Sequence, residues 1–128
     1  MSEYVLDASA VLALLNHEDG AETVQELLPR AVISTVNISE IVTRLVAKGM
    51  PEGEIRDVFS LLGLESIPFD EESAFRSGLL YTITHSSGLS LGDRACLTLA
   101  RNLNAAAVTA DRAWQDLDSG VQLRFIRS

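Results

Sequence analysis

The sequence has little of what disulfide scaffolds, zinc sites and basic nucleic-acid binders require. Cys96 is the only cysteine, which excludes an internal disulfide and argues against a cysteine-based zinc site. The two histidines, His17 and His85, lie far apart without metal-ligand spacing, so we interpret both as surface or loop residues. Lys and Arg together number 10 against 18 Asp and Glu, a formal net charge of −8. This balance excludes a protein that binds nucleic acid through a general positive field, and it argues against a polybasic protein of the membrane surface.

Targeting and membrane signals are also missing. The first seven residues lack the basic region of a signal peptide, and no apolar run is long enough to span a membrane. Neither glycine-rich phosphate loop, GxxxxGK[ST] or GxGxxG, occurs. With one cysteine and no membrane segment, we expect a cytoplasmic protein. The 128 residues, 47% of them hydrophobic, predict a single domain over 1–128 with its own core.

Short apolar runs alternate with helical patterns along the chain. The predicted strands are 4–6, 31–33, 64–68, 105–109 and 122–126. The predicted helices are 10–15, 21–28, 36–47, 51–62 with Pro51 in its first turn, 71–84, 91–103 and a short one through Trp114. This alternation is typical of an α/β fold with a parallel sheet, and the continuous apolar strands fit a sheet covered on both faces. Ligands of such sheets bind outside the carboxyl ends of the strands.

Four acidic residues are predicted at that carboxyl edge. Asp7 ends the first strand, Asp111 follows the fourth, Glu40 lies one turn into the helix after the second strand, and Asp93 lies in the first turn of helix 91–103. We expect their carboxylates to converge on one crevice. No histidine or cysteine accompanies them, and an all-oxygen cluster is what Mg²⁺ or Mn²⁺ prefers.

Each acid also has a purely structural interpretation. Asp7 and Asp111 suit helix N-caps, and residues 37–40 and 90–93 both match capping boxes. Glu40 can pair with Arg44 one turn along its helix, and its position faces either bulk solvent or a polar cleft. The functional interpretation therefore depends on the four acids together and not on any one of them.

Four motifs resemble those of the PIN domain family, specifically the VapC-type toxins of bacterial toxin–antitoxin pairs. They are Val5-Leu6-Asp7-Ala8-Ser9-Ala10, Asn37-Ile38-Ser39-Glu40, Leu89-Ser90-Leu91-Gly92-Asp93-Arg94-Ala95-Cys96-Leu97-Thr98-Leu99-Ala100 and Val108-Thr109-Ala110-Asp111-Arg112-Ala113-Trp114. Their order and spacing agree with the family from about residue 5 to residue 125. The resemblance implies a PIN-like three-layer α/β sandwich whose central parallel five-stranded sheet has the order 3-2-1-4-5.

The resemblance also implies a metal-dependent endoribonuclease. Its catalytic and metal-binding residues are Asp7, Glu40, Asp93 and Asp111, which would bind Mg²⁺ or Mn²⁺ and cleave RNA. The side chains that would orient these acids are Ser9, Asn37 and Thr109. Asp116 is a candidate fifth acid, with a solvated helix position as the competing interpretation.

Arginines are the candidates for holding the RNA backbone, since the chain has only one lysine. Arg94, Arg112 and Arg44 lie next to the acids in sequence, with ion pairing to nearby acids as the competing interpretation. Trp114 suits either stacking on a base or a hydrophobic anchor, and Cys96 suits the core.

The partners implied by the resemblance are an RNA substrate, a small cognate antitoxin and a second copy in a homodimer, with no membrane. The antitoxin would bind a groove between helices 36–47 and 51–62, around Val58, Phe59 and Leu62, and place a basic residue in the acidic pocket. A non-catalytic PIN-like interaction module is the main alternative. A receiver domain or a haloacid-dehalogenase-type phosphatase is a further one, although both need a late lysine and Lys48 lies too early.

Overall fold

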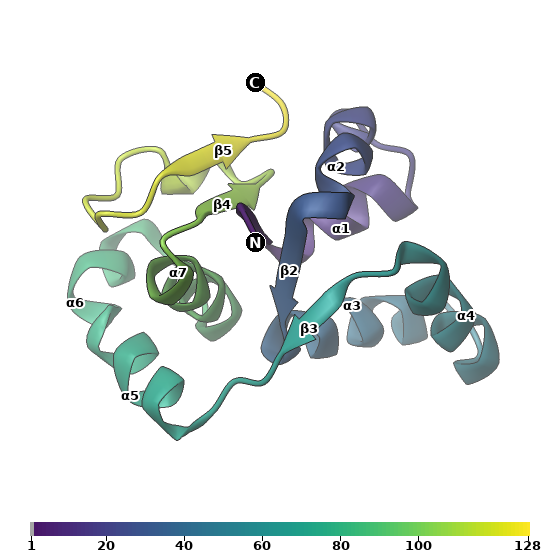
Figure 1. Cartoon of the computed structure of the whole chain (residues 1–128), viewed down its shortest axis with the longest axis horizontal. Helices are drawn as coiled ribbons and strands as arrows, with labels where there is room; N and C mark the ends of the chain where they lie inside the picture. Colours follow the sequence, from purple (N-terminus) through teal and green to yellow (C-terminus); the bar gives the residue numbers. More distant parts are fainter. Residues whose placement is uncertain (1) are drawn as a thin grey trace.

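The computed structural model describes residues 2–128 and contains one five-stranded parallel sheet (Figure 1). The strands are β1 (Tyr4–Leu6), β2 (Ala31–Ser34), β3 (Glu65–Ile67), β4 (Ala106–Thr109) and β5 (Leu123–Phe125). Their order is β3-β2-β1-β4-β5, and every neighbouring pair is parallel. This confirms the expected order. It differs from the order 2-1-3-4-5 of receiver domains and therefore excludes that alternative.

Helices cover both faces of the sheet. The α-helices are α1 (Ala8–Leu15), α2 (Ala21–Leu27), α3 (Thr35–Ala47), α4 (Glu52–Leu62), α5 (Glu71–Leu79), α6 (Tyr81–Thr84) and α7 (Leu91–Leu103). Three 3₁₀ turns, η1 (Leu28–Arg30), η2 (His85–Ser87) and η3 (Arg112–Trp114), complete the described chain. Helices α1 to α4 lie on one side of the sheet and α5 to α7 on the other (Figure 1).

Two separate cores result from the alternation of side chains along the strands. On β1, Leu6 packs into the core with α1 to α4, whereas Val5 packs into the core with Leu80 and α7. Neighbouring strands divide in the same way, with Ile33 beside Leu6 and Val32 beside Val5. Successive strand residues point to opposite faces, so a sheet covered on both faces needs consecutive apolar residues.

The predicted helix 71–84 is interrupted in the structure. Leu80 separates α5 from α6, and its N–H donates to the carbonyl of Ser77, three residues back, at 3.2 Å. The sequence that follows, Tyr81-Thr82-Ile83-Thr84, is aromatic and β-branched and has low helix propensity. Leu80 itself is buried, so tertiary packing fixes the break. Pro51 also differs from its prediction, since it lies at the N-cap and α4 begins at Glu52.

The topology places a switch point at the carboxyl ends of the central strands β1 and β4. Strand β2 lies on one side of β1 in the sheet, and β4 followed by β5 lies on the other side. Helix α3 follows β2 directly, and α7 ends just before β4, so both helices begin at this same edge. Such a switch point is where ligands bind in open α/β sheets.

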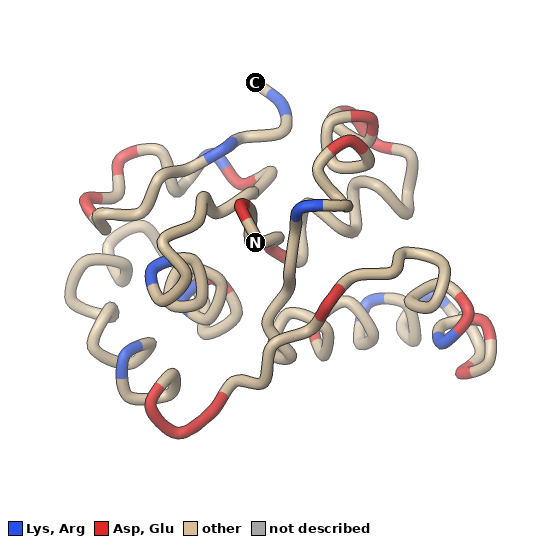
Figure 2. The backbone as a smooth tube through the Cα atoms, in the orientation of Figure 1, with Lys and Arg blue, Asp and Glu red and all other residues tan. Residues whose placement is uncertain are grey.

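Charged residues are distributed unevenly over the fold (Figure 2). Acidic positions recur on α2, on α4, at the start of α5 and in the segment before β5, and basic positions are scattered singly among them. Within residues 2–128, none of the helices has the length and apolar character needed to cross a membrane.

Candidate functional site

Asp7 is a buried carboxylate at the carboxyl end of β1, with only 3% of its surface exposed. It occupies the N-cap position of α1, yet its side chain makes no capping hydrogen bond to that helix. Its Oδ2 instead accepts hydrogen bonds from the hydroxyls of Ser9 at 2.6 Å and Thr109 at 3.1 Å. The capping interpretation of Asp7 is therefore wrong, and its carboxylate is held between the ends of β1 and β4.

The two hydroxyls that hold Asp7 are themselves fixed. Ser9 Oγ lies 3.2 Å from Thr109 Oγ1 and accepts the backbone N–H of Ala110 at 3.0 Å. Thr109 Oγ1 accepts the N–H of Asp111 at 3.1 Å. This network joins residues about 100 positions apart in the sequence, and it ties the ends of β1 and β4 together around one carboxylate.

Glu40 lies on α3, half-buried, and is held by Asn37. Asn37 is fully buried, and its Nδ2 donates both to Glu40 Oε1 at 2.8 Å and to the carbonyl of Gly92 at 3.0 Å. The capping box predicted for residues 37–40 is wrong, because Ser34 caps α3 and accepts the N–H of Val36. Glu40 thus lies half-buried at the edge of an open pocket that α3 forms with the start of α7.

Gly92 provides the space for the Glu40 carboxylate. A Cβ at position 92 would collide with the carboxyl group of Glu40, so no larger residue fits while Glu40 keeps its position. No sequence pattern predicted this role for Gly92. The available signal was a glycine in the first turn of a helix, where it costs about 1 kcal/mol relative to alanine.

Asp93 and Asp111 do form the caps predicted for them, each with one oxygen. The N–H of Ser90 donates to Asp93 Oδ2 at 2.8 Å, and Ser90 Oγ accepts the N–H of Asp93 in return, which completes the capping box. Asp111 Oδ1 accepts the N–H of Ala113 at 2.9 Å and caps η3. Capping therefore orients these two carboxylates and uses only one oxygen of each.

One feature is common to all four acids. Each has one carboxylate oxygen bound by protein hydrogen-bond donors and a second oxygen that receives no hydrogen bond from residues 2–128. The second oxygens are Asp7 Oδ1, Glu40 Oε2, Asp93 Oδ1 and Asp111 Oδ2. Four oriented carboxylates with four free oxygens suit the coordination of a cation.

The four carboxylates influence one another electrostatically. Burial raises the pKa of Asp7 to about 7, and the charges of Asp93 and Glu40 add to this rise against the hydrogen bonds from Ser9 and Thr109. Burial also raises the pKa of Glu40, and the charge of Asp93 adds to this rise. Burial likewise raises the pKa of Asp93, and the charge of Asp111 adds to it. The structure thus brings the acids from β1, α3, α7 and the β4 end close enough for repulsion, as expected of carboxylates that lack a counter-ion.

The donor chemistry of the cluster fits a hard divalent cation, since it consists of carboxylates alone. In the present positions of the side chains of residues 2–128, however, no three His, Cys, Asp or Glu residues are close enough together to hold a metal ion. Cation binding would therefore require these acids to move closer together, and neutralising their mutual repulsion favours that movement.

The arginines predicted near the acids are free of ion pairs. The salt bridges within residues 2–128 join Arg30 to Glu3, Arg56 to Glu52, Arg76 to Glu72 and Arg127 to Glu18. Arg44 lines a small pocket together with Glu40, the Arg94 guanidinium lies 5.8 Å from the Tyr81 ring centre, and Arg112 lies 4.2 Å from that of Phe125. None of these three arginines forms a salt bridge within residues 2–128, although the nearby charges of Arg44 and Arg94 act to lower the pKa of Glu40 and of Asp93, respectively.

The remaining candidates take structural positions. Trp114 is completely buried in the core beside α7, so it is a hydrophobic anchor and does not stack on a ligand. Cys96 is likewise a core residue. Asp116 is exposed in the turn after η3, in agreement with the solvated alternative, and His17 and His85 are exposed as expected.

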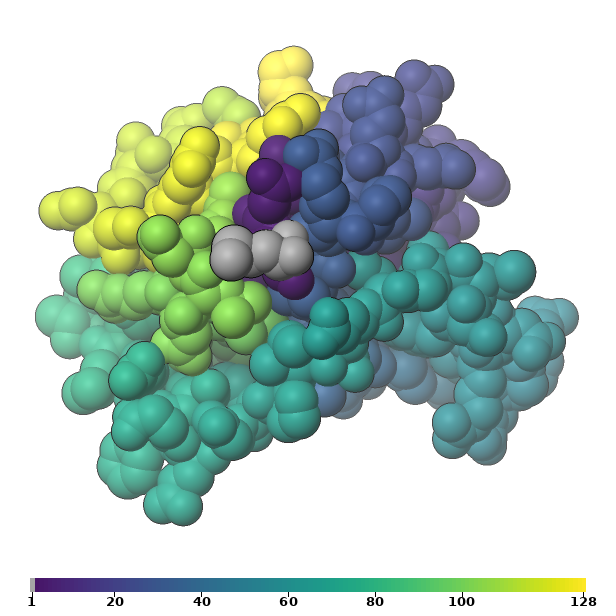
Figure 3. Space-filling view, viewed as in Figure 1, coloured from purple at the N-terminus to yellow at the C-terminus, as the bar shows by residue number. Residues whose placement is uncertain are grey.

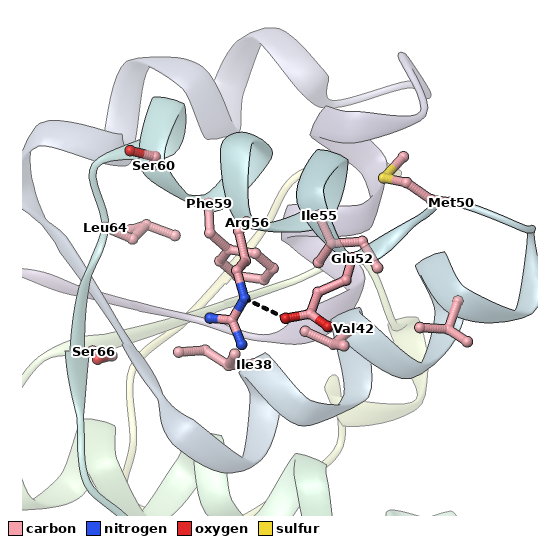
Figure 4. A pocket seen from close by; sticks show the side chains of 11 residues that line it. Ile38, Val42, Met50, Glu52, Ile55, Arg56, Phe59, Ser60, Leu64 and Ser66 are labelled. Atoms are coloured by element: carbon pink, nitrogen blue, oxygen red, sulfur yellow. Dashed lines mark hydrogen bonds and ion pairs between the residues drawn. The ribbon is translucent and has the colours of Figure 1, made fainter.

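A second surface feature is an apolar groove of about 820 Å³ between α3 and α4. These two helices project from one side of the molecule, at the lower right of Figure 3. Ile55 and Phe59 of α4 face Ile38 and Val42 of α3 across the groove, beside an ion pair between Glu52 and Arg56 (Figure 4). Of the residues expected to line it, only Phe59 does so.

Comparisons with known proteins agree with this architecture. The sequence model of the PIN domain family matches residues 4–120. No curated protein matches the chain. The chain is similar to one in the DNA-bound VapBC from Salmonella typhimurium, with a TM-score of 0.77, 18% identity and coverage of 98% of this chain and 99% of that one.

Two further structures extend this likeness. A chain of VapBC2 from Rickettsia felis, bound to a DNA fragment from its promoter, has a TM-score of 0.70 and 25% identity, covering 94% of this chain and 96% of that one. A chain of a toxin-antitoxin complex from Klebsiella pneumoniae has a TM-score of 0.74 and 17% identity, covering 98% and 99%. The fold is thus shared over nearly the whole length of these chains.

Proposed function

The chain belongs to the PIN domain family, and on that premise we propose that it is a metal-dependent endoribonuclease, the VapC-type toxin of a toxin–antitoxin pair. The observation that carries the proposal is the set of four carboxylates at the switch point, each with one oxygen held and one free. A fold used only as an interaction module has no need of a buried carboxylate whose pKa is raised to about 7.

The ions that fit the donor set are Mg²⁺ and Mn²⁺. The residues that would hold them are Asp7, Glu40, Asp93 and Asp111. A bound divalent cation would supply charge neutralisation at the scissile phosphate and lower the pKa of an attacking water molecule. Hydrolysis of this kind needs no attack by the ribose 2′-hydroxyl, in keeping with the absence of a histidine pair near the acids.

The chain's own residues would orient the acids and the substrate. Ser9 and Thr109 fix one oxygen of Asp7, and Asn37 fixes one oxygen of Glu40, so the free oxygens keep their directions. Positioning and charge stabilisation account for most of the catalysis in phosphoryl transfer.

The unpaired arginines Arg44, Arg94 and Arg112 are available for backbone phosphates, because no acid of residues 2–128 forms a salt bridge with them. With a formal net charge of −8, RNA affinity should depend on the divalent cation and be weak without it.

A cleavage assay tests this proposal. Purified protein is incubated with single-stranded RNA and Mn²⁺ or Mg²⁺, with and without EDTA. We expect cleavage that EDTA abolishes and added Mn²⁺ restores. Asp7→Asn and Asp93→Asn should each lower kcat by about 100-fold or more, as does removal of one preorganised electrostatic group.

The matched control is Asp57→Asn, which should leave cleavage unchanged. Asp57 is an exposed acid on α4, a helix that carries none of the four candidate site residues. Full metal-dependent cleavage by Asp93→Asn would contradict the proposal. A protein that never cleaves RNA but still binds a cognate partner would instead be the non-catalytic interaction module.

We also propose that the α3–α4 groove binds a small cognate antitoxin. Its lining is mostly apolar and open to solvent, as a site for an amphipathic segment requires. Phe59→Asp should weaken antitoxin binding, whereas Leu61→Asp should not, because Leu61 is exposed on the same helix and lies outside the groove. Equal losses in both variants would contradict this location.

The same family membership leads us to propose that the protein acts in the cytoplasm, where RNA is available, and forms a homodimer. Light scattering of the purified chain measures its mass directly. A mass equal to the 13.9 kDa of one chain across the micromolar range would contradict dimerisation.

A further inference from the structure

The structure has an exposed aromatic pair formed by Tyr81 of α6 and His85 of η2. Their rings stack with centroids 4.9 Å apart and planes inclined by 17°. The His85 ring nitrogen Nδ1 lies 2.8 Å from the carbonyl oxygen of Tyr81, which fixes the histidine against its neighbour. Both side chains are exposed, with Tyr81 at 57% of its surface, so part of the stacked pair is open to a ligand.

Arg94 connects this pair to the acids. It follows Asp93 in the first turn of α7, where its N–H donates to the carbonyl of Ser90, and its guanidinium lies 5.8 Å from the centre of the Tyr81 ring. Its Nε is buried and has no hydrogen-bond acceptor among residues 2–128. The guanidinium thus lies over the Tyr81 ring, forms no salt bridge within residues 2–128, and keeps at least one N–H without an acceptor there.

From this arrangement we infer that the Tyr81–His85 pair is a stacking site for one unpaired base of the RNA, with Arg94 contacting a neighbouring phosphate. This inference rests on the proposed function. An arginine suits a phosphate oxygen, and exposed aromatic faces bind the bases of single-stranded RNA by stacking. Since only unpaired bases can be stacked in this way, the protein should prefer single-stranded segments next to its cleavage site.

Trp114 does not serve this purpose, although it is the larger aromatic residue and lies in a motif beside Asp111. It is completely buried, so no base reaches it. Phe75 of α5 is exposed at 65%, but its ring neither stacks on another aromatic ring nor contacts a cation within residues 2–128, and α5 carries none of the four acids. Phe75 is therefore a matched control for the loss of an exposed ring.

The test is a double-mutant cycle between the protein and the RNA. A short single-stranded RNA with one cleavage site is prepared with an abasic nucleotide at each position in turn. Values of kcat/KM are measured with Mn²⁺ for the wild type and for Tyr81→Ala, His85→Ala, Tyr81→Phe and Phe75→Ala. Thermal unfolding of each variant confirms that it is folded.

We expect Tyr81→Ala and His85→Ala to lower kcat/KM by about 5- to 160-fold, the range that base–aromatic stacking supports. One abasic position should lower the wild-type value by a similar factor and have no further effect in Tyr81→Ala, because the same contact is already lost. Tyr81→Phe and Phe75→Ala should remain within about twofold of the wild type, since the first keeps the ring.

Several results would overturn the inference. Additive losses at every abasic position would mean that no base stacks on this pair, and a Phe75→Ala loss equal to that of Tyr81→Ala would remove the specificity of the site. If Tyr81→Ala instead changes the oligomeric mass or the antitoxin affinity without coupling to any base, the pair belongs to a protein interface.

Failure of the proposed function gives a different result. In that case the wild type cleaves no RNA under any metal condition, and the same cycle is measured by fluorescence anisotropy of the labelled RNA. Coupling of Tyr81→Ala to one base in that binding assay supports the stacking site even without cleavage, and absence of coupling overturns it.

Discussion

The buried carboxylate of Asp7 should make the metal-free protein less stable as the pH rises from 5 to 8. For an acid whose pKa is higher in the folded than in the unfolded state, the folded state binds the proton more tightly. Its ionisation therefore opposes folding, and stability is lost as the pH rises from the unfolded pKa through the folded one. For Asp7 this window extends from 3.8 to about 7.

The size of the effect follows from the difference between the two pKa values. At about 1.4 kcal/mol per pKa unit, ionised Asp7 destabilises the folded state by about 4 kcal/mol above pH 7, and about 2.5 kcal/mol of this develops between pH 5 and pH 8. Asp7→Asn keeps an oxygen that can accept from Ser9 and Thr109 but carries no charge. It should therefore remove about 2–3 kcal/mol from the pH dependence of the unfolding free energy.

The measurement is urea unfolding at pH 5, 6, 7 and 8 in EDTA, for the wild type, Asp7→Asn and the exposed control Asp57→Asn. Because burial also raises the pKa of Glu40 and Asp93, Asp7→Asn should keep a smaller slope of the same sign. Saturating Mg²⁺ or Mn²⁺ should stabilise the wild type at pH 8 more than it stabilises Asp7→Asn. Equal slopes in the wild type and Asp7→Asn would refute this reasoning.

Three other substitutions have defined outcomes. Gly92→Ala introduces a Cβ where the Glu40 carboxylate lies, so kcat for RNA cleavage should drop by about 100-fold, as expected for a misplacement of about 1 Å, and an unchanged kcat would contradict the need for this space. Trp114→Ala empties a fully buried site and should lower the free energy of unfolding by about 3–5 kcal/mol in urea titrations. Arg56→Ala removes an exposed ion pair with Glu52 and should change that free energy by at most about 0.5 kcal/mol.

Much of the fold could be predicted from the sequence because strands and helices depend on near neighbours along the chain. The apolar run around Val5 and Leu6 indicated a strand covered on both faces, and the two residues do pack into different cores. The capping box of Ser90 and Asp93 was also predictable, since both of its hydrogen bonds join residues three positions apart. That the whole of 1–128 forms one domain remains a prediction.

The arrangement of the candidate site could be predicted only in outline. The order of strands and acids along the chain placed the four acids at one edge, but the capping box at residues 37–40 was wrong because Ser34 begins the helix one turn earlier. The sequence could not decide whether Asp7 caps α1 or is held between the ends of β1 and β4. That choice depends on Thr109, which lies 102 positions away and is brought to Asp7 by the pairing of β1 with β4.

The alternation of strands and helices, the order of the four acids along the chain and the shortage of positive charge can all be obtained from the amino-acid sequence. The packing of distant segments fixes which carboxylate oxygens are held and which are free, gives the Glu40 carboxylate the space beside Gly92, and leaves Tyr81 exposed while Trp114 is buried. The physical reason is the range of the interactions. Hydrogen bonds within a helical turn are fixed by adjacent residues, whereas the contact between Asn37 and Gly92 spans 55 positions and forms only when α3 packs against α7.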